Sequence, residues 1–162
     1  MLSGCFGTDV EHYADLEPAI DLREFFTGDL RGWGLIQDRK GRVIKRFDFD
    51  MVGRWNGNQG VLDEEFVYYD GEKQNRSWRL EDLGNGKYRG EADDVVGSAK
   101  IEQSGSALNL KYELVVPIGD SDYRFKFDDW MWHMNDDVVI NRAVMRKFGI
   151  RVAELTVIMQ KQ

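Results

Sequence analysis

The sequence predicts a mainly β protein, a single antiparallel up-and-down barrel of about eight to ten strands with one short N-terminal helix. From Leu30 onward, alternating apolar and polar runs are separated by turn signals, which is typical of an antiparallel sandwich or barrel. The chain has 162 residues with 17 Gly and 2 Pro, which suits one domain with many turns. Such a meander must hide its edge strands, and closure into a barrel does so best.

The first part of the chain differs from the rest. Residues 6–16 show no clear period, so we expect residues 1–16 to contain a flexible tether and residues 17–162 to form the barrel domain. Residues 17–27 are predicted to form the short helix, because Pro18 stands near its start, acidic residues fill its first turn and Gly28 follows it. Residues 30–160 are predicted to form the strands.

The strands follow one another in a regular pattern. In residues 42–55, Phe47, Phe49 and Met51 alternate with charged residues, which predicts one buried face. Asp70-Gly71 predicts the turn of a hairpin between residues 61–69 and 72–80. One further strand is predicted to begin at Leu30 and another near Tyr123. The remaining predicted strands cover residues 87–93, 95–103, 107–116, 138–146 and 150–160.

Composition excludes several functional classes. Lys and Arg number 22 against 29 Asp and Glu, a net charge of −7 without a basic stripe, so we expect no nucleic-acid partner. The longest apolar stretches fall far short of the roughly 20 residues that span a bilayer. One Cys and two His cannot form the usual zinc sites, and no calcium loop occurs, so neither a metal nor a cofactor is predicted.

The only cysteine, Cys5, follows Leu2-Ser3-Gly4, and these four residues resemble a bacterial lipobox. The resemblance implies a lipid anchor on Cys5, a membrane as partner and a periplasm-facing location in the bacterial cell envelope. Phe6 rather than Asp follows the cysteine, which by analogy favours the outer membrane. A lipobox also implies a basic and apolar leader upstream. The alternative for a lone cysteine is an inert buried thiol.

Two motifs near the predicted helix resemble the lipocalins. Phe26-Thr27-Gly28 follows the helix, and Gly32-Trp33 opens the meander. The resemblance implies a lipocalin-like barrel in which an arginine from a late strand, Arg142 or Arg151, stacks on Trp33.

From about Cys5 to Gln160, the chain also resembles an uncharacterised family of bacterial lipoproteins, a domain of unknown function. Its members are usually membrane-anchored and are associated with enzymes that modify membrane fatty acids, so the resemblance implies a lipid-related role without assigning catalytic residues. The motifs that carry it are Leu62-Asp63-Glu64-Glu65-Phe66, Asp70-Gly71, Arg76-Ser77-Trp78, Tyr88-Arg89-Gly90, Asp94-Val95-Val96-Gly97, Phe127-Asp128-Asp129-Trp130-Met131, Asn141-Arg142-Ala143 and Lys147-Phe148-Gly149.

Aromatic and charged residues suggest a ligand cavity. A barrel of this size encloses either a packed core or one small ligand. The five tryptophans offer flat apolar walls of the kind that pockets use: Trp33, Trp55, Trp78, Trp130 and Trp132. Arg76 and Arg142 could hold an anionic head group such as a carboxylate. Alternatively, the tryptophans belong to the core and to interfaces, and the arginines pair with acidic residues such as Glu64, Glu65 or Asp129.

The densest polar and aromatic cluster is residues 128–133. Strand alternation places Asp128 and Asp129 on opposite faces, so one carboxylate faces inward. An inward carboxylate must be paired or protonated, and Asn141 and Arg142 are the expected partners. It could form an ion pair that fixes strand register, or it could be a ligand-orienting or acid–base group.

The ligand-binding residues predicted together are Arg76, Trp78, Asp129, Trp130, Trp132, Asn141 and Arg142. We expect an envelope lipoprotein that binds a small apolar, fatty-acid-like molecule. Two alternatives stay open: a lipid-modifying enzyme that uses inward carboxylates such as Glu64 with Asp129, and a structural or protein-binding module with a filled barrel. The sequence has neither a Gly-x-Ser-x-Gly motif nor a phosphate-binding loop.

Overall fold

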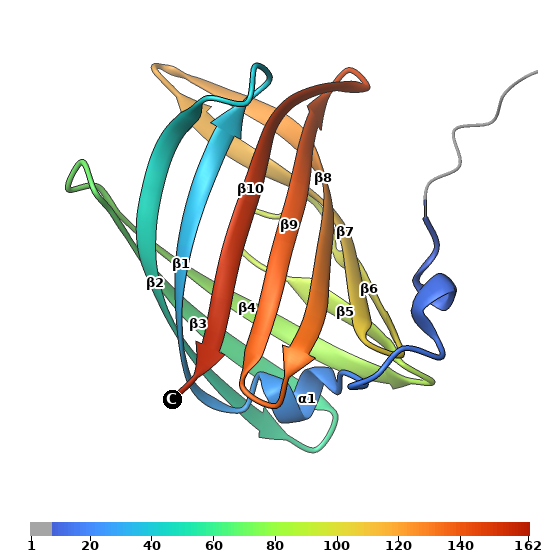
Figure 1. The fold of residues 1–162 in the computed structure, drawn as a ribbon. Helices are drawn as coiled ribbons and strands as arrows, with labels where there is room; N and C mark the ends of the chain where they lie inside the picture. The colour runs from blue at the N-terminus through green and yellow to red at the C-terminus, as the bar shows by residue number, and fades with distance from the viewer. Residues whose placement is uncertain (1–7) are drawn as a thin grey trace, which may run out of the picture.

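The computed structural model describes residues 8–162, in which ten strands form one closed antiparallel barrel (Figure 1). Each strand pairs with its neighbours in the chain, and the last pairs with the first. The predicted up-and-down barrel is confirmed, at the upper end of the expected strand number. The strands are β1 (Gly28–Asp38), β2 (Val43–Asn56), β3 (Gln59–Tyr68), β4 (Lys73–Gly84), β5 (Lys87–Glu91), β6 (Ala99–Ser104), β7 (Ala107–Ile118), β8 (Ser121–Asn135), β9 (Val138–Lys147) and β10 (Ile150–Lys161).

The barrel closes between β1 and β10 in a regular register that runs from Leu30 opposite Lys161 to Asp38 opposite Ala153. Closure satisfies the backbone groups that an open sheet would leave at its edges. The inward positions of β1 include a glycine where a larger residue would not fit. A Cβ atom at Gly34 would lie 2.2 Å from the Phe47 ring, so the ring of Phe47 fills that part of the core.

One end of the barrel, the lower end, is covered by the single-turn helix α1 (Leu22–Phe25) (Figure 1). Asp21 caps the helix by accepting a hydrogen bond from the Glu24 backbone N–H. Leu22, Phe25 and the following Phe26 are only 2 to 3% exposed. Their burial in the lower end anchors the helix.

The helix is shorter than the predicted span of residues 17–27. The backbone N–H of buried Ile20 donates a hydrogen bond of 2.8 Å to the Gly105 carbonyl. The chain before α1 therefore contacts the β6–β7 turn instead of forming intrahelical hydrogen bonds. Tertiary contacts therefore replace the first helical turns. Within residues 8–162, no helix is long and apolar enough to cross a bilayer.

Part of the expected tether packs on the outer wall of the barrel. Residues Val10–Tyr13 form a 3-10 turn, η1, beside β6 and β7 (Figure 1). Val10 is buried, and the Tyr13 ring lies 5.6 Å from the Trp130 ring and 6.3 Å from the Trp132 ring. Cys5, the predicted lipidation site, lies outside the described residues.

Gly53 provides a test of the packing between α1 and the barrel. A Cβ atom at Gly53 would lie 1.7 Å from the carbonyl oxygen of Phe26, a backbone atom that cannot move alone. We expect Gly53→Ala to lower the free energy of unfolding by about 2 kcal/mol or more in urea denaturation. Val52→Ala is the control on the same strand, because Val52 is 37% exposed. Equal stability of both variants would contradict this account of the lower end.

Candidate functional site

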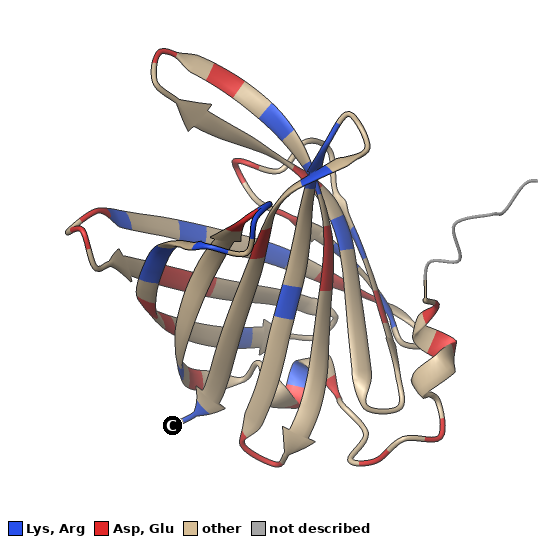
Figure 2. Ribbon diagram, turned by 45° about the horizontal axis from the view of Figure 1, so that its top comes forward, with Lys and Arg blue, Asp and Glu red and all other residues tan. Residues whose placement is uncertain are grey.

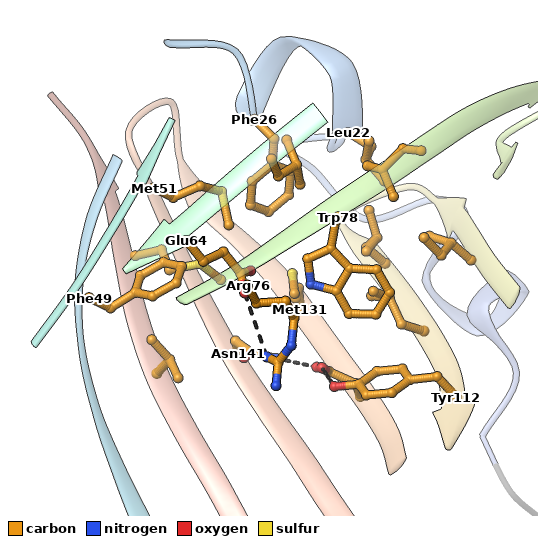
Figure 3. A pocket seen from close by; sticks show the side chains of 18 of the residues that line it. Leu22, Phe26, Phe49, Met51, Glu64, Arg76, Trp78, Tyr112, Met131 and Asn141 are labelled. Atoms are coloured by element: carbon orange, nitrogen blue, oxygen red, sulfur yellow. Dashed lines mark hydrogen bonds and ion pairs between the residues drawn. The ribbon is translucent and has the colours of Figure 1, made fainter. Parts of the chain in front are cut away.

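A cavity of about 90 Å³ lies inside the barrel next to α1, whose Leu22 and the following Phe26 contribute to its lining (Figure 3). Most of its lining is apolar and includes Phe49, Met51, Leu62, Trp78, Leu108, Met131, Leu155, Val157 and Met159. Five polar residues share the cavity: Glu64, Arg76, Tyr112, Asp129 and Asn141. An apolar cavity of about 150 Å³ is known to bind benzene, so this smaller space suits only a small group as long as its walls do not move.

Arg76 projects into the cavity from β4 and is held by Asp94. Its Nε donates hydrogen bonds of 3.1 and 3.0 Å to the two carboxylate oxygens of Asp94, and its Nη2 donates one of 2.7 Å. Asp94 lies between β5 and β6, where the carbonyl of Asp94 accepts a hydrogen bond of 2.9 Å from the backbone N–H of Val115. The segment between these short strands thus brings a carboxylate to the arginine.

Glu64 is the second carboxylate beside Arg76. Its Oε2 lies 3.6 Å from Nη1 of Arg76, and its side chain is only 10% exposed. Within residues 8–162, this oxygen has no hydrogen-bond partner. Burial raises the pKa of Glu64 to about 7, although the charge of Arg76 acts in the opposite direction. Glu64 can therefore exist with or without its proton near neutral pH.

Asp129 forms a second polar group with Tyr112 and Asn141. The Tyr112 hydroxyl donates a hydrogen bond of 2.8 Å to Oδ2 of Asp129, and Nδ2 of Asn141 donates to Oδ1. Burial raises the pKa of Asp129 to about 6, although these hydrogen bonds lower it. Burial and the charge of Asp129 raise the pKa of Tyr112 well above its usual value, so the hydroxyl keeps its proton and acts as a donor.

The predicted site residues divide between the interior and the outer wall. Arg76, Trp78, Asp129 and Asn141 line the cavity, and the Trp78 ring lies 5.5 Å from the Tyr112 ring. Asp129 and Asn141 are in contact, as expected from their positions in the sequence.

Trp130, Trp132 and Arg142 point away from the cavity. Since Asp129 and Met131 of β8 line it, the alternate residues Trp130 and Trp132 face outward, where they contact Tyr13. Arg142 faces outward next to inward Asn141 and donates a hydrogen bond of 2.6 Å from Nε to Oε1 of Glu154. A ligand inside the barrel would therefore not contact these three residues, in contrast to the sequence-based prediction.

The expected stacking on Trp33 is also absent within residues 8–162. Arg151 lies 3.2 Å from Oε2 of Glu154, the residue that also pairs with Arg142. The guanidinium near the Trp33 ring belongs instead to Arg31, whose Cζ lies 5.8 Å from the ring centroid. Arg31 and Trp33 are two residues apart on one strand and share its outer face.

The sequence-based prediction missed Tyr112 and Asp94 as site residues and considered Glu64 only as an ion-pair or acid–base partner. Tyr112 could have been found, because it is the one residue with a polar group among the apolar positions of the alternating run 108–116. Asp94 gave no such signal, since an irregular segment brings it to Arg76. Within residues 8–162, no three His, Cys, Asp or Glu side chains converge as a metal site requires.

The raised pKa of Glu64 predicts a pH-dependent stability. Because the pKa of about 7 in the folded chain exceeds the usual 4.5, the folded chain binds this proton more tightly than the unfolded chain. The resulting stabilisation is present at low pH and is lost as the pH rises through 7. Between about pH 5 and pH 8, we expect the free energy of unfolding to fall by about 2 kcal/mol more in the wild type than in Glu64→Gln.

Urea denaturation at several pH values measures this difference. Glu65→Gln is the matched control, because Glu65 is the exposed neighbour of Glu64 on the same strand. Its pH dependence should follow that of the wild type. Parallel curves for the wild type and Glu64→Gln would contradict the assignment of a buried titrating group.

Known proteins share the fold of this chain, and one family matches its sequence. A protein of unknown function from the DUF3598 family of Nostoc punctiforme matches with a TM-score of 0.62 and 12% identity over 90% of this chain, which spans 51% of that protein. Rv2717c of Mycobacterium tuberculosis matches with a TM-score of 0.62 and 14% identity over 91% of this chain and 99% of its own. At these identities, the likeness concerns the fold alone. No curated protein matches the sequence. Residues 1–161 match the family described as protein of unknown function DUF3833, and the chain belongs to this family.

Proposed function

We propose that this protein binds one small, mainly apolar molecule inside the barrel and holds its polar head at Glu64. The observation that carries the proposal is the buried Oε2 of Glu64, which has no hydrogen-bond partner within residues 8–162 and lies in a cavity with mostly apolar walls. A buried carboxylate oxygen without a partner is destabilising. A ligand that donates a hydrogen bond to this oxygen would remove that cost.

The charges around Arg76 favour a neutral head group over a carboxylate. Asp94 binds the guanidinium through both of its oxygens, and Glu64 lies 3.6 Å away, so the positive charge is already offset. A further anion would meet two carboxylates in the cavity, Glu64 and Asp129. A fatty-acid-like ligand with an alcohol, an amide or a protonated acid as its head fits these charges best.

The volume of the cavity sets a second requirement. A long acyl chain does not fit into about 90 Å³, so the walls must move to admit one. Met51, Met131 and Met159 all line the cavity. Their unbranched thioether side chains adapt to space more readily than branched residues do. We propose that these methionines make room for the apolar part of the ligand.

A specific observation also favours a second candidate, an enzyme that performs acid–base chemistry on the bound lipid. Burial raises the pKa of Glu64 to about 7 and that of Asp129 to about 6, so both carboxyl groups can exchange protons near neutral pH. Carboxyl groups of this kind in one cavity are suited to general acid and base roles. Chemical change of a bound lipid, followed by mass spectrometry and lost in Glu64→Gln, would separate an enzyme from a carrier.

We further propose that Cys5 carries a lipid anchor that holds the protein in the bacterial cell envelope, with the outer membrane favoured. The lipobox Leu2-Ser3-Gly4-Cys5 supports this location. The contact of Tyr13 with Trp130 and Trp132 is consistent with it, because the chain after the anchor would reach the barrel at its outer wall. The interior would then be free to bind a ligand.

Ligand binding can be tested with octanol and octanoate. Titration calorimetry near pH 8 should show that the wild type binds octanol more tightly than octanoate, because Glu64 is then largely ionised and accepts a hydrogen bond. Glu64→Gln should bind octanol about tenfold to a hundredfold more weakly, the range for a hydrogen bond to a charged group. Glu65→Gln should bind as the wild type does. If neither octanol nor octanoate binds, the filled barrel becomes the better account.

Lipidation can be tested in a bacterial host that acylates lipoproteins. Expressed behind a lipoprotein signal peptide, the wild type should incorporate labelled palmitate and sediment with membranes, because several acyl chains anchor a protein firmly. Cys5→Ala should lose the label and should no longer be processed at this site. Absence of label from the wild type would rule out the anchor without affecting the ligand proposal.

A further inference from the structure

The charges of the barrel are unevenly distributed between its two ends. Five connections lie at the end opposite α1: four tight turns and the longer β5–β6 segment, which holds Asp93 and Asp94. We define the upper rim as the four tight turns with their flanks, residues 38–46, 68–73, 117–124 and 146–151. The upper rim holds 10 Lys and Arg and 5 Asp and Glu, a net charge of +5 in a chain whose net charge is −7, so the rest of the chain has −12. Figure 2 shows Lys and Arg on and beside the upper hairpins, with Asp and Glu at the tips of the β3–β4 and β7–β8 hairpins, and mainly Asp and Glu along the lower turns.

Most of these cations are free to interact with a partner. Six of the ten form no ion pair with any residue in the range 8–162. They are Arg39, Lys40, Arg46, Lys73, Arg146 and Lys147. The upper rim therefore presents positive charge that neighbouring carboxylates do not offset.

Exposed apolar side chains lie among these cations. Phe148 is 91% exposed, Tyr69 58% and Ile118 52%, although each is large enough to stabilise a core. Val43, Ile44 and Ile150 of the upper rim are also at least half exposed. A cluster of exposed apolar groups at one end of a domain is typical of a surface that binds a partner.

Phe148 occupies a backbone conformation that does not suit it. Its φ is +52° and that of Gly149 is +75°, so the β9–β10 turn has two successive left-handed residues. Asn-Gly is the preferred pair in such a turn, because a bulky side chain is strained there. Nζ of Lys147 lies 4.8 Å from the Phe148 ring centroid and 5.3 Å from that of Tyr123. An exposed aromatic residue, held at a conformational cost beside a cation, indicates a functional tip.

We propose that the upper rim is a docking surface for a bilayer of anionic phospholipids. Lys and Arg would bind the lipid phosphates, and Phe148 with its apolar neighbours would enter the interface between head groups and acyl chains. The charge complementarity favours an anionic membrane over a neutral one, and the exposed apolar tips favour a membrane over a nucleic acid. This contact is separate from an anchor on Cys5 and places the upper end of the barrel against the lipid.

Vesicle flotation tests the proposal directly. The full 162-residue chain is used with Cys5→Ser, so that no acyl group contributes to binding. The protein should float with vesicles of phosphatidylcholine and phosphatidylglycerol and not with phosphatidylcholine alone. Added salt should weaken binding, because screening acts on exposed charges. Equal binding to both kinds of vesicle would overturn the proposal.

Matched charge variants locate the surface. Arg39→Gln with Lys40→Gln removes two exposed, unpaired cations of the upper rim and should weaken binding about tenfold to thirtyfold. Lys87→Gln with Lys111→Gln removes two exposed, unpaired cations outside the rim and should leave binding near that of the wild type. Equal weakening by both pairs would show that only the total charge matters and would overturn the proposal.

Phe148→Asn separates docking from folding. Because Asn suits the left-handed conformation, this variant should unfold at a higher urea concentration than the parent chain. It should nevertheless bind anionic vesicles several-fold more weakly, since the apolar tip is lost. Vesicle binding unchanged in Phe148→Asn, together with equally tight binding to heparin, would identify a general polyanion site and overturn the assignment to a bilayer.

Discussion

Arg76 carries a positive charge into the barrel, and this charge constrains the structure around it. A buried guanidinium is tolerated only when carboxylates and hydrogen bonds offset its loss of water. Asp94 supplies the close partner, and the path of the chain between β5 and β6 follows from this need. These two strands have only five and six residues, so the segment between them can reach Arg76. Glu64 adds a second carboxylate 3.6 Å from the guanidinium, and its Oε2 has no hydrogen-bond partner within residues 8–162.

The fold could be predicted from the sequence because its signals are local. Alternation in runs such as 108–116 specifies which face of a strand is buried, and Asp70-Gly71 specifies a turn. The helix was predicted too long because its start depends on contacts that are not local in sequence. Whether residues 17–21 continue a helix depends on contacts such as that of Ile20 with Gly105, which join parts of the chain far apart in sequence. Local propensity does not contain that information.

The interior site could be predicted only in part. Alternation separated Asp129 from Asp128, and the proximity of Asn141 across a short turn followed from the hairpin. Trp130 and Trp132 were grouped with the cavity because aromatic residues suit pockets. They lie on the same strand as Asp129, but at alternate positions whose side chains point to the opposite face. The same alternation places the side chain of Arg142 on the outer face, because its neighbour in the chain, Asn141, points inward. Consistent use of alternation would have removed all three residues from the predicted site.

Closure of the barrel has a consequence for how the chain folds. Every other strand pair joins consecutive strands, whereas β1 and β10 bring Leu30 together with Lys161. Lys161 also donates a hydrogen bond of 2.7 Å from Nζ to the Glu24 carbonyl, so the last strand helps to fix α1. While the chain folds, the inner faces and both edges of the sheet stay uncovered until β10 pairs with β1. A chain that lacks β10 would therefore expose both its apolar interior and two unpaired strand edges.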